Sequence, residues 1–188
     1  MKLKDLLLAS RSYRRFKQTP LLSEKDLCDL IESARLSPSA RNDQSLRFIL
    51  VNTKASCEKL FPFTAWAGYL RDWDGPKENE RPTSYIIILG DTSAYGIDVG
   101  IAAQSILLTA VEKGFGGCIL GSIERAKIKE VFSIDEEDKI ALLIALGKPD
   151  EKVVIDLMKD KDTKYYRDNN SVHHVPKRAL EDLIIKTL

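Results

Sequence analysis

The sequence predicts a mixed α+β domain built around one central sheet. Short apolar runs typical of buried strands alternate only loosely with amphipathic segments of helical period. The chain has 188 residues, of which 44% are hydrophobic and 30% charged, so it resembles an ordinary globular protein rather than a disordered or fibrous one. We therefore expect a single domain over residues 1–188 with one hydrophobic core.

A first helix is predicted from Ser23 onward. Ser23 and Asp26 have the spacing of a capping box, in which each side chain accepts a hydrogen bond from the other residue's backbone. Apolar residues then follow at i, i+3, i+4 and i+7 and form one helical face, namely Leu27, Leu30, Ile31 and Ala34. Pro38 is expected to end this helix.

Two buried strands are predicted in the first half of the chain, at residues 48–51 and 85–89, because both are short apolar runs. Residues 54–60 resemble a polar helix. Residues 61–82 contain three prolines, two glycines and two tryptophans, which indicates a loop.

Residues 95–113 predict a helix that is apolar on nearly every face. Such a helix is buried all round. Polar residues interrupt it too often for a membrane span, so we expect a partner subunit to cover part of it.

The second half of the chain predicts two further strands, at 118–120 and 140–146, with a short helix between them. Gly147 to Pro149 is expected to stop the second strand. Residues 151–170 are polar and show no clear period. A last helix is predicted after Pro176, with Leu180, Leu183 and Ile184 on one face.

Charge and cysteine content exclude several functional classes. Lys and Arg number 29 against 28 Asp and Glu, so the net charge of +1 argues against a dedicated nucleic-acid binder. The apolar run Leu6–Ala9 is too short for a signal peptide or a membrane span. The three cysteines lack metal-finger spacing and fit free thiols in a reducing cytoplasm. The adjacent His173 and His174 point to different faces, which disfavours a shared metal.

Three polar segments are candidates for binding chemistry. Residues 11–16 contain three arginines and a serine, a donor set that suits phosphate, although a solvated basic turn has the same composition. Residues 37–44 combine small side chains with two carboxamides, which suits a flat heterocycle or an ordinary loop.

The third segment, residues 114–122, is glycine-rich but follows a helix and opens a strand, so it does not fit the dinucleotide fingerprint. Gly121 instead indicates a place, at or just past the end of a strand, where the backbone must come close to another group. Lys177 and Arg178 follow Pro176, and their positive charges would oppose the dipole at the start of the predicted last helix. Their presence there indicates either a bound anion nearby or a chance pair of surface cations.

Five motifs together resemble the FMN-dependent nitroreductase family, in the same order and over most of the chain. They are R-S-Y-R-R-F at 11–16, A-R-L-S-P-S-A-R-N-D-Q at 34–44, D-V-G-I-A-A-Q-S-I-L-L at 98–108, G-F-G-G-C-I-L-G at 114–121 and A-L-G-K-P at 145–149. The resemblance implies a nitroreductase-like α+β fold, with a central mixed sheet flanked by helices. It also implies an obligate type of homodimer, with FMN at the interface and residues from both chains contributing.

The resemblance also implies roles for individual residues. Arg11, Ser12 and either Arg14 or Arg15 would bind the ribityl phosphate, together with Lys177 and Arg178. Pro38, Ser39 and Ala40 would lie against the flavin ring, while Asn42 and Gln44 would bond its polar edge and the ribityl chain. Gly121 and Ser122 would direct backbone N–H groups toward flavin N5 and O4. Trp66, Tyr69 and Trp73 would cover the ring and select the acceptor, or would simply pack under their loop.

The implied activity is electron transfer from NADH or NADPH through flavin N5 to a small organic acceptor such as a nitroaromatic or a quinone, in a ping-pong cycle. The cofactor carries the chemistry, so no catalytic acid–base side chain is expected, and no metal is expected either. The alternatives are another flavin-dependent reduction, such as dehalogenation or enone reduction, or a nucleic-acid binder that uses the patch Arg11–Phe16. We expect no nucleic acid and no membrane among the partners.

Overall fold

The computed structural model describes residues 2–90 and 92–188, with side chains left out for residues 92–95. The helices are α1 (Leu3–Ala9), α2 (Glu24–Arg35), α3 (Lys54–Leu60), α4 (Thr92–Glu112) and α5 (Arg125–Phe132), with short 3-10 turns at Ala40–Asn42, Phe61–Phe63 and Glu78–Glu80. The strands are β1 (Phe16–Lys17), β2 (Arg47–Val51), β3 (Ser84–Leu89), β4 (Gly116–Leu120), β5 (Ile140–Pro149), β6 (Val153–Leu157), β7 (Tyr166–Arg167) and β8 (His173–Lys177).

The chain divides into two compact units. The first contains Met1–Trp66 and Gly75–Asp150, and the second contains Ala67–Asp74 and Glu151–Leu188. Compactness alone does not decide whether each unit folds independently. The expectation of a single domain therefore stays a prediction.

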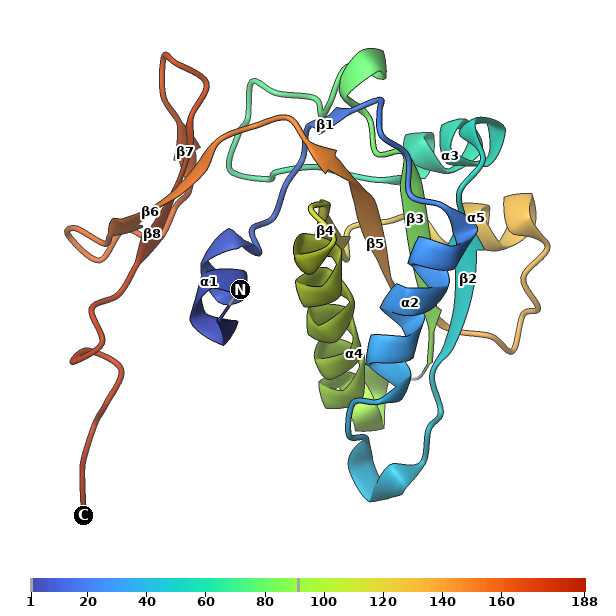
Figure 1. The fold of residues 1–188 in the computed structure, drawn as a ribbon, viewed down its shortest axis with the longest axis horizontal. Helices are drawn as coiled ribbons and strands as arrows, with labels where there is room; N and C mark the ends of the chain where they lie inside the picture. Colours follow the sequence, from blue (N-terminus) through green and yellow to red (C-terminus); the bar gives the residue numbers. More distant parts are fainter. Residues whose placement is uncertain (1, 91) are drawn as a thin grey trace. The chain divides into compact units, whose positions relative to one another are not determined.

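The first unit is built on a sheet in the order β1-β5-β3-β2, with β4 also paired to β5 (Figure 1). The long strand β5 pairs with β3 and β4 along most of its length and with β1 at its C-terminal end. All four ladders are antiparallel, so the expected mixed sheet is wrong for this unit. A single parallel bridge joins Ser12 to Gly117.

The core of the first unit lies between this sheet and the helix pair α2 and α4, which run side by side (Figure 1). Leu27 and Leu30 of α2 face Ile106 of α4 in one apolar cluster with Ile86 and Ile144 of the sheet. Every residue of β3 is buried, because alternate side chains point to the two faces of the sheet and both faces are covered.

Several sequence-based predictions are confirmed. Ser23 and Asp26 form the capping box at the start of α2, and the predicted apolar face is buried at Leu27, Leu30 and Ala34. The expected polar helix is α3, and the expected short helix is α5. Strand β2 is confirmed but lies at the sheet edge, so only Val51 is fully buried rather than the whole strand.

Helix α4 is confirmed, although one chain does not cover it all round. Its inner face is buried from Val99 to Val111, whereas the side chain of Ile97 is 78% exposed and Gly100 and Gln104 are also exposed. No helix in the described residues is long and apolar enough to cross a membrane.

The end of the chain differs most from the prediction. Strand β5 continues through Gly147 to Pro149, because Gly147 pairs with Gly116 of β4 and β1 provides partners for Lys148 and Pro149. The predicted last helix is wrong: Pro176 lies in strand β8, and residues 178–188 form no helix. The apolar residues of that expected helix, Leu180, Leu183 and Ile184, are exposed. Helical spacing without a packing surface does not stabilise a helix in water.

The second unit is a three-stranded sheet in the order β6-β8-β7, in a segment where no strand was expected. Strands β6 and β8 are parallel, and β7 is antiparallel to β8. Strand β7 pairs only with His173 and His174, so Pro176 lies where β8 has a free edge, the place in a sheet where proline is tolerated.

Candidate active site

The arginine-rich segment, residues 11–16, lies along the start of β4. Ser12 forms the parallel bridge to Gly117, and the Tyr13 N–H donates to the Gly117 carbonyl at 3.0 Å. A Cβ on Gly117 would lie 2.4 Å from the Ala145 carbonyl oxygen, and one on Gly116 would lie 2.6 Å from the Tyr13 ring. These two glycines therefore allow three backbone segments to approach closely.

The guanidinium groups of this segment are partly withdrawn from water. Arg14 is buried and donates to the Ser12 carbonyl at 3.2 Å. Arg11 donates from Nη2 to the Leu7 carbonyl at 2.6 Å. Its Nε is buried and has no hydrogen-bond acceptor in the part of the chain that the structure describes. A buried N–H needs an acceptor, so this donor fits a bound anion such as a phosphate.

The loop 38–44 has a different construction. Pro38, Ala40, Asn42 and Gln44 are exposed, so little apolar contact holds the loop. The Ala40 N–H donates to both carboxylate oxygens of Asp98 on α4, at 3.0 and 3.1 Å. Just before the loop, the Ser37 hydroxyl lies 2.7 Å from that of Ser105.

Helix α4 separates these two regions within one chain. The loop is bonded to Asp98 near the start of α4, whereas the arginine-rich segment lies on Gly116 and Gly117, just beyond its end. The 14 residues from Asp98 to the end of α4 at Glu112 correspond to roughly 21 Å of helix. A single chain therefore does not bring the loop and the arginines to one point.

Gly121 and Ser122 follow β4 directly. The Ser122 carbonyl accepts from the Ala65 N–H at 3.0 Å, which holds this strand end against residues 64–65. Gly121 is exposed, and an added Cβ would meet no heavy atom within 4 Å. The space beside Gly121 is open, so none of the described residues makes the close backbone approach that its position suggested.

The three aromatic residues predicted to cover the ring do not form one group. Trp66 is buried in the first unit, stacks on Phe61 with ring centres 6.1 Å apart, and donates to Thr64 Oγ1 at 3.0 Å. This environment favours a packing role for Trp66. Tyr69 and Trp73 belong to the second unit.

The second unit holds these two aromatic residues through its own side chains. The Tyr69 ring lies edge-on to Tyr165, and the Arg167 guanidinium lies 4.6 Å from the centre of the Trp73 ring. Lys177 and Arg178 are exposed residues of the same unit. Their meeting with the arginines of residues 11–15 stays a prediction.

The two histidines lie on opposite sides of β8, as adjacent residues of a strand must. His173 is buried, whereas the His174 Nδ1 lies 2.7 Å from the Asp156 carboxylate and Nε2 lies 3.5 Å from Asp168. The hydrogen bond to Asp156 raises the pKa of His174 above its usual value. No group of three or more potential metal ligands is present among the described residues.

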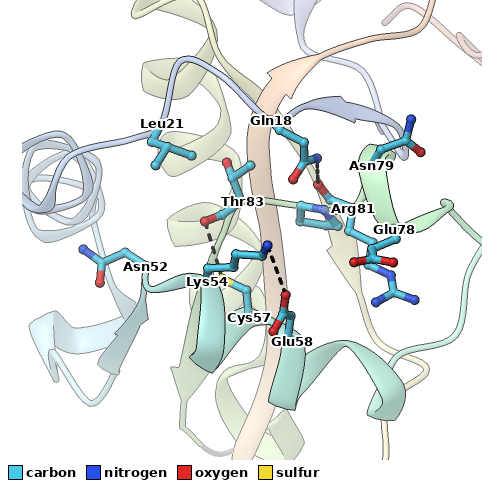
Figure 2. Close-up of a pocket in the computed structure, with 11 residues that line it drawn as sticks. Gln18, Leu21, Asn52, Lys54, Cys57, Glu58, Glu78, Asn79, Arg81 and Thr83 are labelled. Carbon is cyan, nitrogen blue, oxygen red and sulfur yellow. Dashed lines mark hydrogen bonds and ion pairs between the residues drawn. The ribbon is translucent and has the colours of Figure 1, made fainter.

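A cavity of about 580 Å³ lies elsewhere in the first unit (Figure 2). It is lined by Gln18, Leu21, Asn52, Lys54, Cys57, Glu58, Glu78, Asn79, Arg81, Pro82 and Thr83. None of the predicted site residues lines it, and no motif indicated it, because its walls come from segments more than sixty residues apart.

Cys57 of this cavity donates to the Thr83 carbonyl at 3.4 Å, and burial raises the pKa of its thiol to about 11. It therefore stays a thiol at neutral pH and is not an activated nucleophile.

Comparison with solved structures defines the class of this fold. The chain superimposes with a TM-score of 0.66 on a "putative nitroreductase in complex with FMN" from Exiguobacterium sibiricum 255-15, with 17% identity over 80% of this chain and 90% of that one. It superimposes with a TM-score of 0.68 on an enone reductase of gut-bacterial fatty acid biohydrogenation, with 19% identity over 85% and 94% of the two chains. The protein thus has the α+β fold of nitroreductase-like proteins.

Sequence comparison gives the family. The profile of the Nitroreductase family matches residues 7–72 and 90–148. A protein of Bacillus subtilis (strain 168) named "Putative NAD(P)H nitroreductase YfhC" is 28% identical over 171 residues, which cover 79% of this chain and 85% of that protein. The chain therefore belongs to the Nitroreductase family and is an oxidoreductase.

Proposed function

We propose that this protein is an FMN-dependent NAD(P)H oxidoreductase that reduces a small organic acceptor, such as a nitroaromatic or a quinone, by a ping-pong mechanism. The observation that carries the proposal is the arginine-rich segment fixed on β4, whose Arg11 Nε is buried and lacks an acceptor in the described part of the chain. The family membership and the FMN-bound relative support FMN as the ligand.

FMN, when bound, would supply the redox chemistry, namely hydride acceptance from NAD(P)H and electron transfer to the acceptor. The residues of the protein bind the cofactor and orient it. Arg11, Ser12 and one of Arg14 and Arg15 hold the phosphate with charged and neutral donors. Lys177 and Arg178 add charge to the same phosphate.

The flavin ring is held by a second copy of the chain. Pro38, Ser39 and Ala40 lie against it, and Asn42 and Gln44 bond its polar groups. This arrangement is supported by the length of α4, which separates the loop from the arginines in one chain. The exposed α4 residues Ile97, Gly100 and Gln104 are the surface that the homodimer covers.

Backbone N–H groups at Gly121 and Ser122 orient the ring and stabilise negative charge that develops on it. The open space beside Gly121 leaves room for a ring edge to approach. No acid–base side chain is assigned a catalytic role.

A second candidate is enone reduction on the same site, favoured by the likeness to the enone reductase. Tyr69 and Trp73 are the residues that would distinguish acceptors, because an aromatic face stacks on a nitroaromatic or quinone and not on an aliphatic enone.

One absorbance experiment tests the proposal. Purified protein, reconstituted with FMN if necessary, is expected to show an oxidised-flavin spectrum that bleaches with NADH or NADPH and returns with an acceptor. Steady-state assays with a nitroarene, a quinone and an enone then separate the two candidates. A protein that stays colourless after incubation with excess FMN would overturn both.

A further inference from the structure

The backbone of the loop 38–44 is strained. Arg41, Asn42 and Gln44 have φ angles of 54°, 58° and 49°, the left-handed region that residues with a Cβ rarely adopt. Backbone conformations of this kind persist only where neighbouring structure holds them. The loop 38–44 therefore needs a contact from the surrounding fold.

Hydrogen bonds within the loop do not fix its place in the fold. The Asn42 N–H donates to the Ser39 carbonyl and the Asp43 N–H to the Ala40 carbonyl, both at 3.0 Å, which sets only the local turn. Among the described residues, Asp98 is the group outside the loop that bonds it, through the Ala40 N–H.

Asp98 is well placed to hold the loop. It lies in the second turn of α4 and is only 4% exposed, with the buried Val99 and Ala102 as neighbours on the same helix. A buried carboxylate needs hydrogen-bond donors, and both of its oxygens accept from Ala40. The interaction is mutual: the loop stabilises the buried carboxylate, and the carboxylate fixes the loop backbone.

We infer that Asp98 is a positioning residue for the flavin, which acts through the Ala40 backbone without touching the cofactor. This inference rests on the proposed function, in which Pro38 to Ala40 lie against the ring. The hydrogen bonds from Ala40 to the Asp98 carboxylate fix the position of the Ala40 backbone relative to α4. Pro38, Ser39 and Ala40 are thereby held in one position for contact with the ring.

The test compares Asp98→Ala with Asp98→Asn. Alanine removes the acceptor, whereas asparagine keeps one carbonyl oxygen for the Ala40 N–H. Asp98→Ala is expected to weaken FMN binding about tenfold or more, the usual effect of losing a hydrogen bond to a charged group. Asp98→Asn is expected to retain most of the wild-type affinity for FMN. If the alanine variant does not fold, the FMN affinity of Asp98→Asn is measured in its place.

Ser105→Ala is the matched control, because it removes the Ser37 contact on the same helix and leaves the Ala40 bonds in place. Its FMN affinity is expected to match that of the wild type, measured by quenching of flavin fluorescence.

Hydrogen exchange of the Ala40 amide in the protein without FMN provides a second readout that does not depend on the proposed function. Exchange is expected to speed up about tenfold or more in Asp98→Ala, with α4 itself still protected. Wild-type exchange at Ala40 together with wild-type FMN affinity in Asp98→Ala overturns the inference. A wild type that binds no FMN instead overturns the proposed function, while the exchange rates still decide whether Asp98 holds the loop.

Discussion

The two units of this chain are stabilised by different kinds of interaction. The first has a core of fully buried aliphatic side chains between its antiparallel sheet and the helices α2 and α4. The second is held by polar and aromatic contacts, such as Arg167 with Glu151 and Trp73, and His174 with Asp156 and Tyr166. Aliphatic burial does not depend on pH, whereas contacts between ionisable groups do. The stability of the second unit should therefore depend on pH more than that of the aliphatic core of the first unit.

The largest expected effect is loss of stability when the core of the first unit is truncated. Ile144 is 0% exposed at the centre of β5, so Ile144→Ala removes buried aliphatic surface and leaves a cavity. We expect the free energy of unfolding to fall by about 4 kcal/mol in denaturant titration. Ile185→Ala is the matched control, because Ile185 is 100% exposed, and it should change stability by less than about 0.5 kcal/mol. Equal losses of stability in Ile144→Ala and Ile185→Ala would show that the buried core does not dominate the stability of the first unit.

A smaller effect is expected from the close backbone approach at β4. A Cβ on Gly117 would clash with the Ala145 carbonyl oxygen, so Gly117→Ala should lower stability by about 2 kcal/mol and displace the arginine-rich segment. Gly121→Ala meets open space and should stay within about 0.5 kcal/mol of the wild type in thermal unfolding. A Gly117→Ala variant with wild-type stability would show that β4 and β5 can move apart at this point without loss of stability.

Phosphate binding provides the next test within the first unit. Arg11→Ala should weaken FMN binding about tenfold, because one charged hydrogen bond to phosphate is lost. Arg35 is a suitable control: it is exposed and pairs with Glu32 on α2, so Arg35→Ala should leave FMN affinity unchanged. Binding is measured by flavin fluorescence, and unchanged affinity in Arg11→Ala would remove this residue from the phosphate site.

The smallest effect is expected in the second unit and depends on pH. The Asp156 hydrogen bond raises the pKa of His174, so its stabilising contribution is complete below the unfolded pKa of about 6.5 and is lost as pH rises through the higher folded value. Titration of the His174 ring by NMR should give a midpoint above 6.5, which Asp156→Asn lowers. Asp160→Asn, an exposed acid of the same unit, should not change it. An unchanged midpoint in Asp156→Asn would show that the hydrogen bond to Asp156 does not control the pKa of His174.

The sequence predicted the first unit better than the second. Local signals placed α2, because its cap and apolar face lie within a dozen residues, and long apolar runs placed β3 and α4. In the second unit, β6 is half exposed and its partner β8 lies about twenty residues away, so no periodicity marked either strand. The apolar spacing after Pro176 predicted a helix that no packing surface supports.

The candidate site shows the same division. The arginines, the loop 38–44 and the glycines after α4 could be found as motifs, since each is contiguous in the sequence. Asp98 was visible only as the first residue of a motif, and its bond to Ala40 joins residues 58 positions apart. The cavity around Cys57 had no signal at all, because its walls meet only in the folded chain.

The sequence by itself determined the family and the main helices and supplied the motifs that predict a flavin site, because these depend on short patterns of residue type. Only the tertiary structure decided that Gly116 and Gly117 allow β4, β5 and the arginine-rich segment to approach, and that a buried carboxylate holds the loop. The physical reason is that local patterns set backbone preference and burial, whereas close approach and hydrogen bonding between distant segments exist only once those segments have packed.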